Sequence, residues 1–176
     1  DQSDADMMAE MGFNMLRLPI NWSGLEPVEG QFDESYLEKV DAVIEACRKV
    51  GVYVLVDFHQ DAYSKEIGED GAPLWAIVPE PQELLEGPMH DLNERRTSEQ
   101  VFDAFTSFFN NRDNLQDRFL PAWKLVIERY KDMPHVIGFE PMNEPVAIHI
   151  DDGYKKLDDF YLKVDTALRE IDLKHT

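Results

Sequence analysis

The stretch that decides the fold is Val-Ile-Gly-Phe-Glu-Pro-Met-Asn-Glu-Pro, residues 136–145. Its first residues are apolar and predict a short buried strand. The strand ends at Asn143-Glu144-Pro145, which sets an amide beside a carboxylate at the strand's carboxyl end. In parallel α/β proteins this end of the sheet binds ligands. A Glu there can donate a proton and an Asn can hydrogen-bond a sugar hydroxyl, although a solvated Asn-Glu-Pro turn explains the tripeptide alone equally well.

Two earlier stretches also predict strands. Residues 13–19 contain Arg17, and the β-branched run of residues 52–58 leads into His59, Gln60 and Asp61. Strands of parallel sheets are nearly all apolar, so a guanidinium within one needs a carboxylate partner. The alternative is an edge strand that leaves Arg17 in solvent.

Helical patterns alternate with these strands. In the clearest one, residues 33–51, apolar side chains recur at spacings of three and four, and Ser35 with Glu38 predicts its N-terminal cap. Further helical patterns cover residues 98–109, 115–130 and 154–173. Pro121 either kinks the second of these or marks its start. Strict alternation of helix and strand predicts an α/β fold with a parallel sheet.

The arrangement favours a (β/α)8 barrel or a doubly wound sheet. Neither a Gly-x-Gly-x-x-Gly nor a Walker-type loop is present, which disfavours nucleotide binding. A complete barrel takes about 250 residues, and the strands predicted here cannot close one. We therefore expect residues 1–176 to be the N-terminal half of a (β/α)8 catalytic domain. It would hold about strands 2–4 with helices 1–4, completed by polypeptide outside this chain.

Composition limits the possible partners. The 176 residues are 43% hydrophobic, enough for one core, and the formal net charge of −19 disfavours nucleic acid and anionic membranes. Because no run of about 18 apolar residues occurs, we expect no transmembrane segment. Cys47 is the single cysteine, so no disulfide can form within the chain.

Residues 60–97 predict a long loop rich in Gly, Pro and acidic residues. Loops of this length are uncommon unless they are functional. The loop follows a strand, so it should lie on the same face as His59 and Asp61. Leu74, Trp75 and Ile77 indicate that it folds onto the protein, and His90 is expected to face solvent.

Three features together resemble glycoside hydrolase family 5 and its clan of retaining (β/α)8 glycosidases. They are Arg17 in Leu-Arg-Leu-Pro, His59 after the next strand, and Asn143-Glu144-Pro145 after the third. The resemblance implies that Glu144 is the general acid/base, that His59 and Asn143 bind the sugar, and that Arg17 supports the nucleophile. The nucleophile, a second Glu on strand seven, would lie outside this chain, which alone should be inactive.

Glu140 is a poor substitute for that nucleophile. It precedes Glu144 by four residues, about 13 Å along an extended strand. A retaining mechanism needs carboxyl groups about 5–5.5 Å apart. We expect Glu140 to form an ion pair with Arg or Lys instead.

A narrower resemblance comes from Asp-Phe-His-Gln-Asp-Ala-Tyr-Ser, residues 57–64, and Gly-Ala-Pro-Leu-Trp, residues 71–75. These stretches are similar to the endoglycoceramidase branch, which cuts between the glycan and ceramide of glycosphingolipids. The resemblance implies that Asp61 joins His59 at the sugar, that Trp75 is a weaker substrate-binding candidate, and that the protein is extracellular and needs no cofactor. A glycolipid or oligosaccharide is the implied substrate.

Other functions stay open. A β-glucosidase acting on glucosylceramide or steryl glucoside, a cellulase-type glucanase and a non-catalytic glycolipid-binding relative fit the same residues. A metal enzyme is a further alternative, because His59-x-Asp61 could form a facial triad with His135 or His149. That triad usually sits on an all-β frame, and His135 falls at the start of its strand. We therefore predict no metal.

Overall fold

The computed structural model describes residues 1–85 and 92–175. His90, for which the sequence predicts solvent exposure, lies outside the described residues. Parallel strands β1 (Met15–Ile20), β2 (Tyr53–Phe58) and β3 (Val136–Glu140) form a three-stranded sheet in the order β1-β2-β3. The register sets Pro19 opposite Asp57, and Asp57 opposite Glu140. The predicted α/β fold with a parallel sheet is confirmed.

Helices connect the strands and follow the last one. The described helices are α1 (Gln2–Glu10), α2 (Trp22–Leu25), α3 (Glu34–Lys49), α4 (Leu92–Arg96), α5 (Glu99–Phe109), α6 (Leu115–Tyr130) and α7 (Gly153–Arg169), with short 3-10 turns η1 (Leu74–Ala76) and η2 (Arg112–Asn114). The long loop therefore contains η1 and α4. Pro121 lies inside α6, which begins six residues earlier at Leu115.

The N-terminal cap of α3 differs from the prediction. The carboxylate of Asp33 accepts the backbone N–H groups of Ser35, at 2.8 Å, and Tyr36, at 3.2 Å. Ser35 is thus inside the helix, and the predicted capping box is wrong. An Asp side chain satisfies the free amides of a first turn as well as a Ser does, so the cap could form two residues earlier.

The core lies between one face of the sheet and the helices. Phe58 of β2 and Phe139 of β3 meet Trp123 of α6, with ring centroids 5.6 and 6.3 Å apart. Phe119 of α6 and Phe160 of α7 extend this cluster, with centroids 6.1 Å apart. Each of these side chains is at least 95% buried, and burying one contributes about 1.5–3 kcal/mol. Aromatic packing therefore fixes α6 and α7 against the sheet.

The opposite face of the sheet is more open. Met15, Tyr53 and Ile137 are 42–48% exposed, although each begins or lies within a strand. Arg17 shares this face and reaches Asp57 near the carboxyl end of the sheet. The charged side chains are therefore held on the open face by strands whose other face is anchored in the core.

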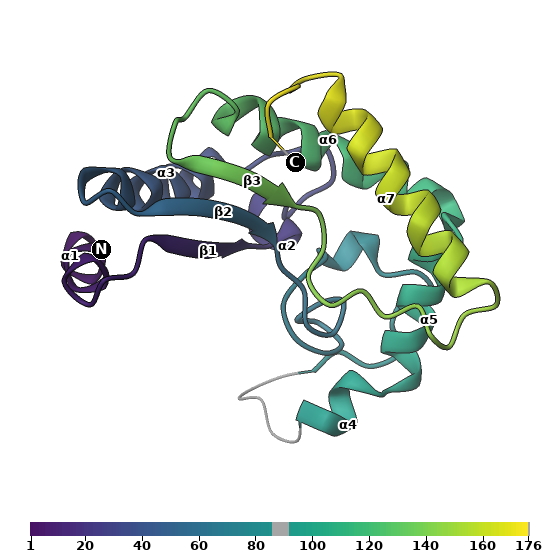
Figure 1. The fold of residues 1–176 in the computed structure, drawn as a ribbon. Coiled ribbons are helices and arrows are strands. Elements are labelled where there is room, and N and C mark those ends of the chain that lie inside the picture. The colour runs from purple at the N-terminus through teal and green to yellow at the C-terminus, as the bar shows by residue number, and fades with distance from the viewer. Residues whose placement is uncertain (86–91, 176) are drawn as a thin grey trace.

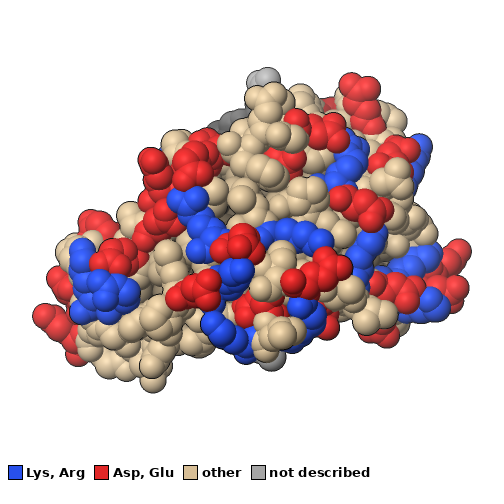
Figure 2. All heavy atoms as spheres, turned by 90° about the horizontal axis from the view of Figure 1, so that it is seen from above, with Lys and Arg blue, Asp and Glu red and all other residues tan. Residues whose placement is uncertain are grey.

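Figure 1 shows how the elements lie around the sheet. The N-terminal helix α1 lies beside the end where the strands begin, and the loops after β2 and β3, with α4 and α5, lie beyond the end where they finish. Figure 2, the view from above, shows Lys and Arg interspersed with Asp and Glu. No helix in residues 1–85 and 92–175 is long and apolar enough to cross a membrane.

Candidate active site

Arg17 is the first organising residue of the site. Its Nε and Nη2 atoms donate to the two carboxylate oxygens of Glu140, at 2.7 and 2.6 Å. Nη2 also donates to Oδ1 of Asn143 at 2.8 Å and lies 3.1 Å from Oδ2 of Asp57. The carboxylate partner predicted for Arg17 and the ion pair predicted for Glu140 are both confirmed. The hydrogen bond to Glu140 is the main cause that raises the pKa of Arg17.

Asp57 connects Arg17 to His59. It is fully buried at the end of β2, and its Oδ2 accepts the Nδ1–H of His59 at 2.6 Å. Burial raises the pKa of Asp57, and the hydrogen bond from His59 offsets part of that shift. Burial lowers the pKa of His59, but the hydrogen bond to Asp57 and the charges of Asp57, Asp61 and Asp70 outweigh it, so that this pKa is raised. Asp57 therefore favours the protonated imidazole.

Asn143 has both ends of its buried amide engaged. Oδ1 accepts from Arg17 at 2.8 Å, while Nδ2 donates to the backbone carbonyl of Gln60 at 3.0 Å and to Oδ1 of Asp61 at 3.1 Å. The Nε2 atom of His59 lies 3.3 Å from Oδ2 of Asp61 and 3.4 Å from Nδ2 of Asn143. The structure thus brings together Arg17, His59, Asp61 and Asn143, which come from β1 and from the loops after β2 and β3.

Glu144 follows Asn143 at the rim of this polar cluster. Its side chain is exposed, and its backbone is left-handed, with φ of 39°. The N–H of Asn143 donates to the carbonyl of Phe58 at 3.1 Å, which keeps the loop beside β2. The charge of Glu144 also raises the pKa of Arg17, after the larger effects of Glu140 and Asp57.

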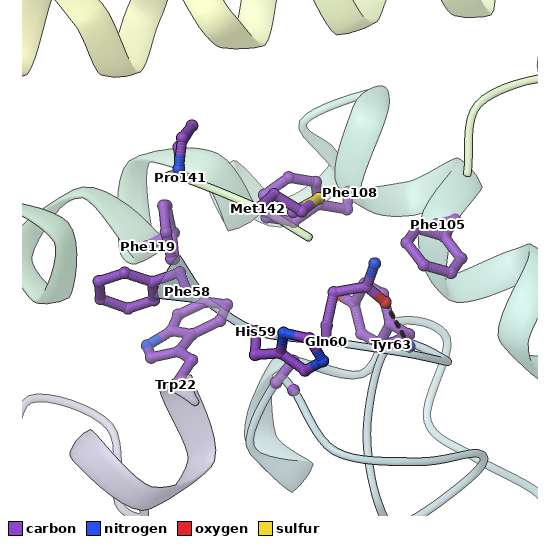
Figure 3. A pocket seen from close by; sticks show the side chains of 12 residues that line it. Trp22, Phe58, His59, Gln60, Tyr63, Phe105, Phe108, Phe119, Pro141 and Met142 are labelled. Atoms are coloured by element: carbon purple, nitrogen blue, oxygen red, sulfur yellow. Dashed lines mark hydrogen bonds between the residues drawn. The ribbon is translucent and has the colours of Figure 1, made fainter. Parts of the chain in front are cut away.

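An apolar pocket lies beside the polar cluster. Its lining includes His59 and Gln60 with Trp22, Phe58, Tyr63, Gly71, Ala72, Phe105, Phe108, Phe119, Pro141 and Met142. Figure 3 shows His59 and Gln60 among the aromatic rings, with Met142 and Phe108 across the pocket. Its volume is about 30 Å³, room for about one water molecule, so it is a small gap in the aromatic packing beside the polar cluster.

Trp75 lies elsewhere. Its Nε1–H donates to the backbone carbonyl of Glu26 at 3.0 Å, and its ring packs edge-on against Trp22, with centroids 4.9 Å apart. The guanidinium carbon of Arg118 lies 4.7 Å from the centroid of its ring. These contacts fasten the long loop to α2 and α6. Trp22, rather than Trp75, lines the pocket together with His59.

The long loop adds acidic groups to the site. Possible ligand atoms of His59, Asp61 and Asp70 lie within 4.8 Å of one another. Asp70, rather than His135 or His149, is therefore the third group beside His59-x-Asp61. His135 stacks on Tyr53 at the start of β3, with centroids 5.3 Å apart. The Nε2 of His149 lies 3.0 Å from the carbonyl of Phe102 on α5.

Arg96 of α4 supplies a second cation near these acids. It forms an ion pair with Glu69, whose side chain is largely buried. The pKa of Arg96 is raised chiefly by the hydrogen bond to Glu69, with smaller effects from the charges of Asp61 and Glu144. The loop therefore faces the cluster with charges of both signs.

Asp57, Gln60 and Asp70 were not predicted as site residues. Asp57 could have been found, because an acidic residue that ends an apolar strand needs a cation nearby. The contacts of Gln60 and Asp70 depend on how the loop folds back after β2, for which the sequence carries no pattern.

Comparisons with known proteins place this arrangement among glycosidases. The family model "Cellulase (glycosyl hydrolase family 5)" matches residues 1–176. An endoglycoceramidase of Cyanea nozakii is 28% identical over 203 residues, covering 98% of this chain and 40% of that protein. Endoglycoceramidase I of Rhodococcus hoagii (strain 103S) is 34% identical over 142 residues, covering 81% of this chain and 28% of that protein.

A solved structure of endo-glycoceramidase II from Rhodococcus sp. superposes with a TM-score of 0.86 at 29% identity, covering 99% of this chain and 42% of that one. The chain thus spans at most about 40% of these curated relatives. Its parallel strands correspond to part of a (β/α)8 barrel. Because the family model covers every residue, the chain belongs to glycosyl hydrolase family 5.

Proposed function

We propose that the chain is part of a retaining endo-β-glycosidase that cuts the bond between the glycan and the lipid of glycosphingolipids. The observation that carries this proposal is a polar network directly beside Glu144: Arg17 donates to Asn143, and Asp57 links Arg17 to His59. Family membership adds support, because retaining glycosidases need a carboxylic acid at such a rim.

Glu144 is the proposed general acid/base. Protonated at first, it gives its proton to the oxygen that leaves as the lipid hydroxyl. A Glu contributed by further polypeptide, about 5–5.5 Å away, attacks the anomeric carbon. Water then releases the sugar, with Glu144 acting as base. Glu144 lies in the loop after the carboxyl end of β3, and its residue is exposed.

The neighbouring side chains have proposed roles in holding the sugar. Asn143 would bind the 2-hydroxyl, a contact that strengthens in the transition state. His59 and Asp61 would bind the other hydroxyls of the sugar next to the cut. Arg17 would support the incoming nucleophile as a carboxylate, because an opposite charge lowers the pKa of a carboxyl group. Its place on the open face, beside Asp57 and Glu140, suits this role.

The retaining mechanism and the glycolipid substrate draw support from similar proteins. One solved structure of endo-glycoceramidase II is described as a "Lactosyl-Enzyme Intermediate", and another as a "Ganglioside GM3 Complex". A covalent glycosyl-enzyme is the intermediate that a retaining mechanism forms. For the lipid part, we propose the apolar groove of the long loop, lined by Leu74, Trp75, Ile77, Glu80, Pro81 and Leu84.

The experiment that tests this function compares three substrates of the full-length protein that carries this chain. A fluorescent ganglioside, glucosylceramide and a cello-oligosaccharide are each incubated with it, and the products are separated. We expect release of the intact glycan from the ganglioside. Hydrolysis of glucosylceramide or the cello-oligosaccharide alone would favour a glucosidase or a glucanase. Binding of the ganglioside without hydrolysis would favour a non-catalytic relative.

A further inference from the structure

We infer that Gln60 is a positioning residue for Glu144: its buried side-chain amide holds the backbone from which the proposed acid projects. The inference rests on the acid/base role proposed for Glu144. It concerns a residue that makes no proposed contact with substrate through its side chain.

The contacts of Gln60 use both ends of its amide. The side chain lies at the end of β2, and the residue is only 6% exposed. Its Nε2 donates to the backbone carbonyl oxygens of Asn143 and Glu144, the second at 3.0 Å. Its Oε1 accepts the backbone N–H of Tyr63 at 2.9 Å, as Figure 3 shows. One side chain thus ties the loop after β2 to the loop after β3.

The backbone at both tied positions is unusual. Glu144 has φ of 39° and Tyr63 has φ of 67°, a left-handed region that residues other than Gly rarely adopt. Pro145 follows Glu144 and further restricts its backbone. Such conformations persist only where surrounding contacts hold them. The amide of Gln60 supplies these contacts at both positions.

The side chain of Glu144 depends on this backbone for its direction. Within residues 1–85 and 92–175, no hydrogen bond or ion pair involves its carboxyl group, which is exposed. Among these described residues, the direction of the acid therefore follows from its Cα–Cβ bond. Loss of the Gln60 amide would leave buried carbonyl and N–H groups unpaired, and the loop would move to satisfy them. The carboxyl group of Glu144 would then be displaced from the leaving oxygen that it has to protonate.

The test uses Gln60→Met in the full-length protein, because Met keeps the length of the side chain and removes its N–H donors. Two β-lactosides are compared, one with 2,4-dinitrophenol and one with a simple alkyl alcohol as leaving group. Dinitrophenolate departs without a proton, whereas the alcohol needs one. The quantity measured is kcat/KM, which reports formation of the glycosyl-enzyme only.

We expect kcat/KM for the alkyl lactoside to fall about 10–100-fold, as displacing a catalytic group by about 1 Å can do. The dinitrophenyl lactoside should lose less than about threefold. The ratio of the two values within one preparation does not depend on how much of the variant is folded. A loss by the same factor with both substrates, or no loss with either, would overturn the inference.

Gln116→Met is the matched control. Gln116 is also buried, at 7% exposure, and its Nε2 donates to a backbone carbonyl, that of Phe108 on α5, at 2.9 Å. We expect this variant to change both substrates by the same factor. Glu144→Gln separates the two proposals: if it shows no dependence on the leaving group, the proposed function fails, whereas dependence there with none in Gln60→Met rejects only the positioning role.

Discussion

Asp57→Asn tests the electrostatic centre of the site. The carboxylate is fully buried, and its Oδ2 accepts from His59 at 2.6 Å and lies 3.1 Å from Nη2 of Arg17. Asn keeps the shape and a neutral acceptor but loses the charge. Hydrogen bonds to charged groups contribute about 1.5–3 kcal/mol each, and removing one partner of a buried pair costs about 3–5 kcal/mol. Burial nevertheless raises the pKa of Asp57, so desolvation of the charged form outweighs these bonds. The bond to protonated His59 should therefore appear as a loss of about 1.5–3 kcal/mol in unfolding free energy at pH 6 relative to pH 9.

Urea unfolding of the full-length protein at pH 6 and at pH 9 measures this difference as a shift in midpoint with an unchanged slope. Asp159→Asn is the control, because its ion pair with Lys155 is exposed on α7 and the midpoint should barely move. The raised pKa of His59 means that protonating it stabilises the folded protein. This contribution is complete below its ordinary pKa of about 6.5 and is lost as pH rises through the raised value.

The defect of Asp57→Asn should therefore be larger at pH 6 than at pH 9. In histidine-labelled protein followed by NMR, the pKa of His59 should be lower in the variant than in the wild type. A difference between pH 6 and pH 9 below about 0.5 kcal/mol, together with an unchanged pKa of His59, would refute this reasoning about the buried carboxylate.

Three further substitutions test other parts of the site. Burial raises the pKa of Asp70; the charge of His59 opposes this shift, and the charges of Asp61 and Glu69 add to it. Because the charged form of Asp70 is thus disfavoured in the fold, Asp70→Asn should raise Tm at neutral pH. The gain should vanish as pH falls below the ordinary pKa of about 3.8. Trp75→Phe loses the 3.0 Å bond to the Glu26 carbonyl and should cost about 0.5–1.5 kcal/mol in urea unfolding; an unchanged midpoint would contradict this. Arg17→Lys should lower kcat/KM at least about tenfold, because one ammonium group cannot make the paired bonds of a guanidinium to Glu140. Full activity of this variant would show that the paired bonds are not needed.

The order of helices and strands could be predicted from the sequence because apolar spacing records which face of each element is buried. Arg17 shows where such reasoning stops. Its need for a carboxylate follows from electrostatics, but the choice of Glu140 and Asp57 depends on strand register and on a bulge between Val54 and Leu55. That register comes from packing across the sheet and has no signature within any one strand.

The roles of loop residues were harder to predict. Trp75 indicates that the long loop folds onto the protein, which is confirmed, but its partners Glu26 and Arg118 come from distant segments. Gln60 follows a strand like many other polar residues, and its partners Asn143 and Glu144 come from a distant segment. The predicted cap of α3 was wrong for a simpler reason, since the neighbouring Asp33 and Ser35 side chains compete for the same free amides.

Proton donation by Glu144 is tested most directly by kcat/KM of Glu144→Gln in the full-length protein, measured with lactosylceramide beside the binding of the same lipid. Gln keeps the size of the side chain and cannot supply the proton. We predict a loss of about 10²–10⁴-fold in kcat/KM with binding retained. With an activated lactoside as substrate, azide should take the lactosyl group in place of water, because azide needs no base. Turnover of lactosylceramide at the wild-type rate would contradict the role of residue 144.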